Sequence, residues 1–130
     1  MAKIFIADDE LASQWAAVRT LARSGHDLVE AKGGSEALAY LKAYGADLII
    51  LELKLQHVSG AEVCRRIKAL PGYERIPVLI LASHLGPDDV RAAWQAGADL
   101  VVAKPLSCCA LDDVVNNLLQ ASHSIVPHAA

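Results

Sequence analysis

The sequence predicts an α/β protein built on a single doubly wound, five-stranded parallel sheet with helices on both faces. Five short and almost wholly apolar runs alternate along the chain with five amphipathic segments. An apolar run without polar alternation is typical of a strand that is covered on both faces. A helix between consecutive strands makes those strands parallel, and right-handed crossovers leave few ways to wind them.

The expected strands are short and rich in aliphatic residues. They lie at Ile4–Ala7, Leu28–Ala31, Asp47–Leu53, Val78–Ala82 and Asp99–Ala103. Their apolar runs fall far below the roughly 20 residues that are needed to cross a bilayer, so we expect no membrane span.

Five helices are expected to follow the strands. They run from about Leu11 to Ala22, Gly33 to Tyr44, Gly60 to Leu70, Gly86 to Gly97 and Ser107 to Gln120. In the first helix, apolar residues recur at steps of three to four and include Trp15, which is therefore expected to pack in the core. Residues 122–130 are expected to form a flexible C-terminal tail after a domain that occupies residues 1–121.

The composition indicates one globular domain of the cytoplasm. A chain of 130 residues can bury a substantial core. Met1-Ala2-Lys3 leads directly into the first strand and leaves no room for a signal peptide. The net charge is −3 and the basic residues are scattered, which argues against nucleic acid as a partner. Three cysteines, two of them adjacent, do not form a disulfide framework.

Ionisable side chains stand at the ends of three expected strands. Asp8 and Asp9 follow the first strand, Glu52 ends the third, and Lys104 follows the fifth. Ligand sites in such sheets lie beyond the carboxyl ends of the strands, so these side chains should meet in one crevice. Three carboxylates need compensating charge, from Lys104 and from a hard cation such as Mg²⁺. Asp8, Asp9 and Glu52 are therefore a candidate Mg²⁺ site, whereas Glu10 is interpreted only as favouring a helix N-terminus.

The order and spacing of these motifs resemble a response-regulator receiver domain over about residues 3 to 120. The shared motifs are Ile4-Phe5-Ile6-Ala7-Asp8-Asp9-Glu10, Asp47-Leu48-Ile49-Ile50-Leu51-Glu52-Leu53 with Gly60 downstream, Ile76-Pro77-Val78, and Gly97-Ala98-Asp99 running to Lys104-Pro105. The resemblance implies a flavodoxin-like fold with strand order 2-1-3-4-5. It also implies that the acids at the positions of Asp8 and Asp9 hold Mg²⁺.

The resemblance further implies a set of roles for phosphoryl transfer. An aspartate at the position of Glu52 would accept a phosphoryl group from a histidine kinase. A Thr or Ser at the position of Ala82 would grip the phosphoryl oxygens together with the lysine. An aromatic residue at the position of Val101 would turn inward and remodel the neighbouring surface.

Three of these parts are replaced in this chain. Glu52 stands in for the acceptor aspartate, Ala82 has no hydroxyl, and Val101 is not aromatic. The extra methylene of Glu52 advances its carboxylate by about 1.5 Å, and a misplacement of that size costs on the order of a hundredfold in rate. Ser83 is one residue away, and alternation along an extended segment should point it elsewhere. We therefore predict an atypical pseudo-receiver that is not an enzyme.

The leading hypothesis is a phosphorylation-independent, receiver-like signalling adaptor. It would bind another signalling protein (a histidine kinase, an output domain or a regulator), or a second copy of itself as a homodimer, through a face near Trp94, Val101 and Pro105. Glu52 could reach Lys104 and imitate the phosphorylated charge, or the site could be a remnant beside a static surface. We favour the second form.

Two alternatives stay open at this point. The domain could still accept a phosphoryl group, with Glu52 or a nearby group labelled and Ser83 assisting. It could instead be a metal or redox sensor built from His57, His84 and the cysteines, of which Cys108 and Cys109 stand near a helix start that can lower a thiol pKa. The loop residues 56 and 57, Gln and His, replace the Pro-Gly usual in the family, so the loop shape is not predicted.

Overall fold

The computed structural model describes residues 2–55 and 57–125, where five strands alternate with five helices as expected. The strands are β1 (Lys3–Ala7), β2 (Asp27–Ala31), β3 (Leu48–Glu52), β4 (Val78–Ala82) and β5 (Leu100–Ala103). The helices are α1 (Leu11–Arg23), α2 (Gly34–Tyr44), α3 (Gly60–Lys68), α4 (Pro87–Gln95) and α5 (Cys108–Ile125). None of the helices in these two ranges is long and apolar enough to cross a membrane.

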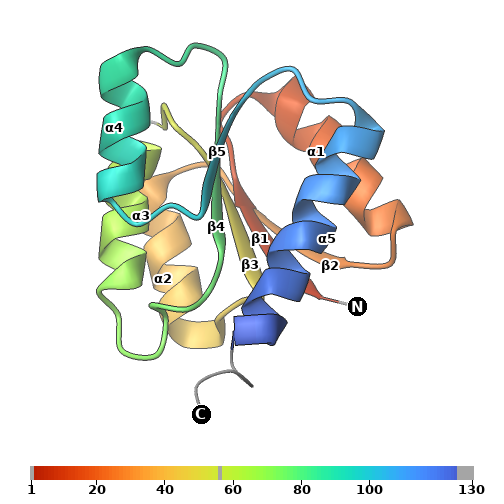
Figure 1. Cartoon of the computed structure of the whole chain (residues 1–130), viewed down its shortest axis with the longest axis horizontal. Coiled ribbons are helices and arrows are strands. Elements are labelled where there is room, and N and C mark those ends of the chain that lie inside the picture. The colour runs from red at the N-terminus through yellow and green to blue at the C-terminus, as the bar shows by residue number, and fades with distance from the viewer. Residues whose placement is uncertain (1, 56, 126–130) are drawn as a thin grey trace.

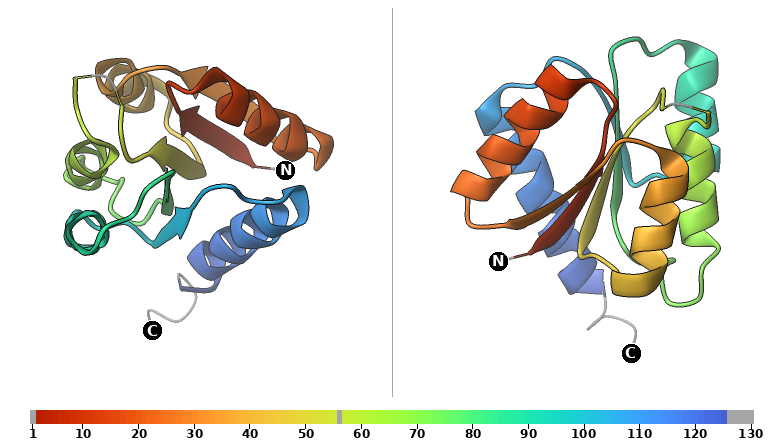
Figure 2. Two further views of the ribbon diagram at one scale, coloured as in Figure 1. Left: turned by 90° about the horizontal axis from the view of Figure 1, so that it is seen from above. Right: turned by 180° about the vertical axis from the view of Figure 1, so that it is seen from behind.

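All five strands pair in parallel in the order β2-β1-β3-β4-β5. Helices α1 and α5 cover one face of the sheet, and α2, α3 and α4 cover the other (Figures 1 and 2). The predicted fold class and strand order are therefore confirmed. The strand order reverses around β1 and β3, so their carboxyl ends flank the switch point at which such sheets bind ligands.

Alternate residues of each strand belong to two different cores. On β1, Ile4 and Ile6 pack with apolar residues of α1 and α5, whereas Phe5 packs with those of α2, α3 and α4. We call these two sides the α1–α5 layer and the α2–α4 layer. Because side chains alternate along an extended strand, neighbouring residues such as Val101 and Val102 lie in opposite layers.

Two features of the helices differ from expectation. Trp15 is 62% exposed, because the buried stripe of α1 runs through Gln14, Ala17 and Leu21, one residue away. The guanidinium of Arg19 lies 5.0 Å from the centre of the Trp15 ring, a cation–π contact on the surface. Helix α5 runs through residue 121 and ends only at Ile125. Residues 126–130 of the expected tail lie outside the described residues, so the domain limit stays a prediction.

Candidate functional site

The register of the sheet brings the predicted ionisable side chains to one edge. The pairing of β1 with β3 ends at Ala7 and Leu51, and the next residue of each strand brings Asp8 beside Glu52. One residue beyond the last pair of β4 and β5, Ser83 stands beside Lys104. The carboxyl ends of parallel strands meet at the same edge, which is why these residues gather although they are far apart in the sequence.

Lys104 closes the crevice by binding two acids at once. Its Nζ lies 2.9 Å from Oδ2 of Asp8 and forms a second ion pair with Oε2 of Glu52. The side chains of Lys104, Asp8 and Glu52 are only 10%, 4% and 8% exposed. The other oxygen of Asp8 accepts a hydrogen bond from the backbone N–H of Glu10, at 2.9 Å. We call Asp8, Glu52 and Lys104 the Lys104 triad.

Glu52 is the least favourably placed charge of the triad. The pKa of the Glu52 carboxyl is raised, chiefly by burial and further by the negative charges of Asp8 and Glu10, although Lys104 acts to lower it. Burial also acts to lower the pKa of Lys104, but its two carboxylate partners outweigh burial and raise it. Oε2 of Glu52 is buried and, within the described residues, makes no hydrogen bond of regular geometry. One ammonium therefore serves two buried carboxylates.

The third predicted acid does not join the triad. Asp9 is exposed. It borders a hollow of about 170 Å³, which is lined by Asp9, Glu10, Glu52, Lys54, Ala82, Ser83 and His84. The structure thus brings the candidate site residues to one place, but it gives Asp9 a different environment from Asp8 and Glu52.

The acids as they are arranged do not fit a Mg²⁺ site. Two of the three candidate ligands, Asp8 and Glu52, are bound by Lys104, which supplies the positive charge that a metal ion would otherwise supply. Within residues 2–55 and 57–125, no three His, Cys, Asp or Glu side chains gather in a way that could hold a metal ion. Within these ranges, His57 and His84 therefore do not form the metal site of the sensor hypothesis.

The loop between β3 and α3 packs closely on the backbone of Glu52. A Cβ at Gly60 would collide with the carbonyl of Glu52, and the N–H of Gly60 donates to the carbonyl oxygen of Leu53 at 2.6 Å. His57 has φ of 69°, in the left-handed region that favours glycine. The position where the family usually has glycine thus keeps a glycine-like backbone, whereas residue 56 lies outside the described residues.

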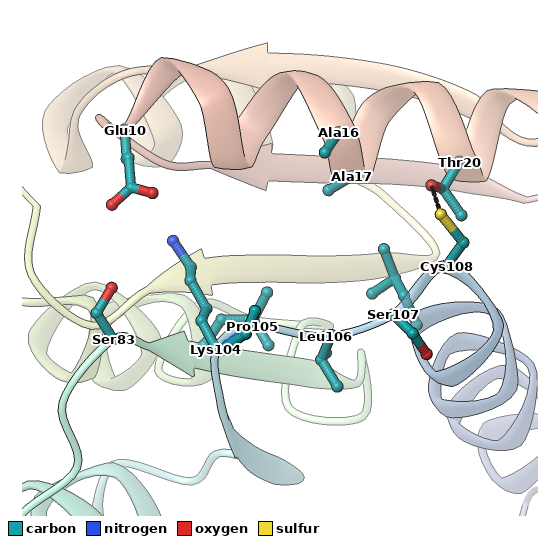
Figure 3. A pocket seen from close by; sticks show the side chains of 12 residues that line it. Glu10, Ala16, Ala17, Thr20, Ser83, Lys104, Pro105, Leu106, Ser107 and Cys108 are labelled. Atoms are coloured by element: carbon teal, nitrogen blue, oxygen red, sulfur yellow. Dashed lines mark hydrogen bonds between the residues drawn. The ribbon is translucent and has the colours of Figure 1, made fainter.

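Two residues lie closer to the site than sequence reasoning indicated. Ser83 follows the end of β4 and lines one hollow with Lys104 and Leu81, whereas Ala82 packs in the α2–α4 layer, so alternation holds. Ser83 also borders the smaller hollow that Glu52 lines. Figure 3 shows the Ser83 hydroxyl and the Lys104 ammonium directed toward the side of Glu10. Glu10, interpreted only as a helix-start residue, lines both hollows. Its position directly after Asp8 and Asp9 in the sequence could have predicted that Glu10 lies at the site.

The three cysteines do not cluster. Cys64 is buried, and burial raises the pKa of its thiol to about 11, which leaves little reactive thiolate. Cys108 and Cys109 are exposed at the start of α5. The Thr20 hydroxyl donates a hydrogen bond to Sγ of Cys108 at 3.3 Å (Figure 3).

The residues of the predicted interaction face differ in environment. Trp94 on α4 is 47% exposed, as an interface anchor requires. Val101 on β5 is half-buried and packs against the core of the α2–α4 layer. Pro105 follows the cis peptide bond after Lys104, is exposed, and borders a hollow between α1 and α5. A common face through all three stays a prediction.

Comparison with known proteins identifies the family. The profile of the response regulator receiver domain matches residues 4–116. The chain belongs to the response regulator receiver family. The receiver is 31% identical over 120 residues to the transcriptional regulatory protein AfsQ1 of Streptomyces coelicolor, covering 92% of this chain and 52% of AfsQ1. It is 34% identical over 105 residues to a gliding motility regulatory protein of Myxococcus xanthus, covering 78% of this chain and 13% of that protein.

Solved receiver structures match the fold along most of both chains. The receiver domain of a signal transduction histidine kinase from Syntrophus aciditrophicus superposes with a TM-score of 0.86 at 28% identity, covering 93% of this chain and 92% of that one. A CheY-like receiver domain protein from Methanospirillum hungatei gives a TM-score of 0.90 at 20% identity, covering 95% and 98%, and shows the fold alone. The receiver spans about half of AfsQ1 and a smaller share of the Myxococcus protein.

Proposed function

We propose that this receiver signals without a phosphoryl group, by binding a partner protein through a surface that does not switch. The observation that supports the proposal most is the Lys104 triad. Its lysine, which the family uses to grip a phosphoryl group, is bound on both sides by Asp8 and by the glutamate that replaces the acceptor.

The acceptor position disfavours phosphoryl transfer. Glu52 carries its carboxylate about 1.5 Å further forward than an aspartate would, and a displacement of that size lowers rates by on the order of a hundredfold. The carboxylate is also buried and in contact with the lysine ammonium. An incoming phosphoryl group would have to separate this ion pair in a nearly dry site, where breaking it is expensive.

The parts that would read a phosphoryl group are also replaced. Ala82 is buried in the core of the α2–α4 layer and has no hydroxyl to offer. Val101 packs against the same core and is aliphatic, so it has no aromatic ring to turn inward. Loss at the acceptor and at both reading positions supports a static surface over a phosphoryl switch.

The ion pair between Glu52 and Lys104 is the contact that a permanent mimic of phosphorylation would need. A carboxylate supplies one negative charge against about 1.5 to 2 for a phosphoryl group, so the imitation is partial. Because Ala82 and Val101 cannot transmit it, we favour the static form. The receiver would then be a non-catalytic adaptor for a histidine kinase, an output domain, a regulator or a second copy, with Trp94 as an anchor. A cytoplasmic location stays a prediction.

The experiment that tests the proposal is intact-mass measurement after incubation with acetyl phosphate and Mg²⁺. The wild type should gain no phosphoryl mass, and neither should Glu36→Asp, an exposed glutamate on α2 that serves as the matched control. Glu52→Asp shortens the acceptor to the family's residue, and Glu52→Asp with Ala82→Thr restores the hydroxyl as well. A label on the wild type would refute the proposal. A label on the double variant alone would show that the replaced residues, and not the fold, prevent the chemistry.

A second candidate function is phosphoryl acceptance at a non-standard group. The observation that favours it is the position of Ser83, which lines the same hollows as Lys104 and Glu52. Peptide mapping of any label on the wild type decides between Glu52 and Ser83. Loss of that label in Ser83→Ala, with the label retained in Ser107→Ala, would establish this candidate.

A further inference from the structure

Beyond the proposed function, we propose that the hollow between α1 and the start of α5 is a binding site for a small amphipathic amine. Its volume is about 550 Å³. Sites for small organic ligands have volumes of about 300–1,000 Å³ and are mostly apolar with a few convergent polar groups. This hollow borders the Lys104 triad at Lys104, and the proposal is tested without phosphoryl chemistry.

Small residues of two helices leave this hollow open. On α1, Ala16, Ala17 and Thr20 face the start of α5, where the chain offers Ser107 and Cys108 (Figure 3). Short side chains at these positions cannot fill the space between the helices. The remaining apolar walls come from Leu81 on β4, from Pro105 and Leu106 in the loop between β5 and α5, and from Leu111 on α5.

The charged residues that line the hollow favour a positively charged ligand. Glu10 directs its carboxylate toward the hollow (Figure 3), and its side chain is exposed. Lys104 is the positively charged residue that lines the hollow. Two buried carboxylates already neutralise its charge, so it attracts an anionic ligand only weakly. A positively charged head group beside Glu10 and Ser83, with an apolar body along the two alanines of α1, complements this arrangement.

The site shares residues with the crevice of the triad, which gives a ligand a direct route to it. Glu10, Ser83 and Lys104 line the hollow, and Glu10 also donates its backbone N–H to Asp8. A molecule bound here would contact the lysine of the triad from the α1–α5 layer. It would thereby act on the position that phosphorylation would otherwise control.

The experiment compares two probes with the same apolar body and opposite charge, phenylbutylamine and phenylbutyrate. Binding is followed by amide chemical shifts of the ¹⁵N-labelled full chain. The amine should shift amides of α1 and of the start of α5, and it should bind about three- to fivefold more tightly than the acid, the range expected for a partly exposed ion pair. Glu10→Gln should remove this preference, whereas Glu36→Gln on α2, the matched control, should keep it.

One further variant and one thiol reporter test the site independently of the charge preference. Ala16→Leu fills the hollow from an exposed position of α1 and should abolish binding of both probes. The thiol of Cys108 lines the hollow, so saturating amine should slow its alkylation by iodoacetamide several-fold and leave Cys109 unchanged. Shifts at α1 and α5 with neither probe would overturn the site. Equal binding of amine and acid, or a preference that survives Glu10→Gln, would overturn the ligand class.

Discussion

Replacing Lys104 by methionine should destabilise the domain strongly, because it leaves two buried carboxylates without a cation. In the wild type, Nζ of Lys104 lies 2.9 Å from Asp8 and pairs with Glu52, and all three side chains are at most 10% exposed. At this distance two unit charges attract by about 6 kcal/mol in a medium with an effective dielectric constant of about 20. Breaking a buried ion pair by removing one partner typically costs about 3–5 kcal/mol, and we expect the upper part of that range here.

The measurement is urea unfolding followed by far-UV circular dichroism. The loss in the free energy of unfolding should be largest near neutral pH and smaller at about pH 5, because burial raises the pKa of Glu52 and, without the lysine, its carboxylate takes up a proton as the pH falls. Lys54→Met is the matched control: this lysine is exposed at the same edge of the sheet and should change the free energy by less than about 0.5 kcal/mol. A loss below about 1 kcal/mol for Lys104→Met, or an equal loss at both pH values, would refute the reasoning.

Three other changes test separate parts of the site. Because the pKa of Glu52 is raised on folding, the free energy of unfolding should fall as pH rises above about 4.5, and Glu52→Gln should remove that decline in urea titrations at successive pH values. Gly60→Ala should cost about 3 kcal/mol in the same assay because its Cβ would meet backbone, whereas Gly33→Ala, with open space around it, should lack this clash penalty. His57→Gly should raise the free energy of unfolding by about 0.5–1 kcal/mol, since φ at this position is 69°; no gain would show that this backbone is unstrained.

The meeting of the acids with Lys104 could be predicted from the sequence because it depends only on strand order and register. Once the strands are parallel, Asp8, Glu52 and Lys104 must end at one edge. Their pairing could not be predicted, because it depends on how far each side chain reaches and on how little water enters. Glu52 has the extra methylene and meets the lysine, whereas Asp9, one residue from Asp8, is exposed.

Other misses have local physical causes. The periodicity of α1 is compatible with a buried face that includes Trp15. The face that is buried in fact lies one residue away, and packing against the sheet decides which of the two faces is covered. Alternation correctly placed Ser83 on the opposite side from Ala82, but it did not show that Lys104 lines the hollow on that same side. The hollow between α1 and α5 depends on the distance between two helices, which no pattern of residue types specifies.

The division of the core by the sheet has a consequence for large-scale mutagenesis. On β4 and β5, neighbours such as Leu81 and Ala82, or Val101 and Val102, contact different layers. Consider a complete substitution scan that records ligand affinity and partner affinity separately. Alternate positions along each strand should then affect different measurements. Enlarging Leu81 or Val102 should alter ligand affinity, and enlarging Ala82 or Val101 should alter partner affinity. The positions sensitive for ligand affinity and those sensitive for partner affinity would then alternate along the same strands, offset by one residue.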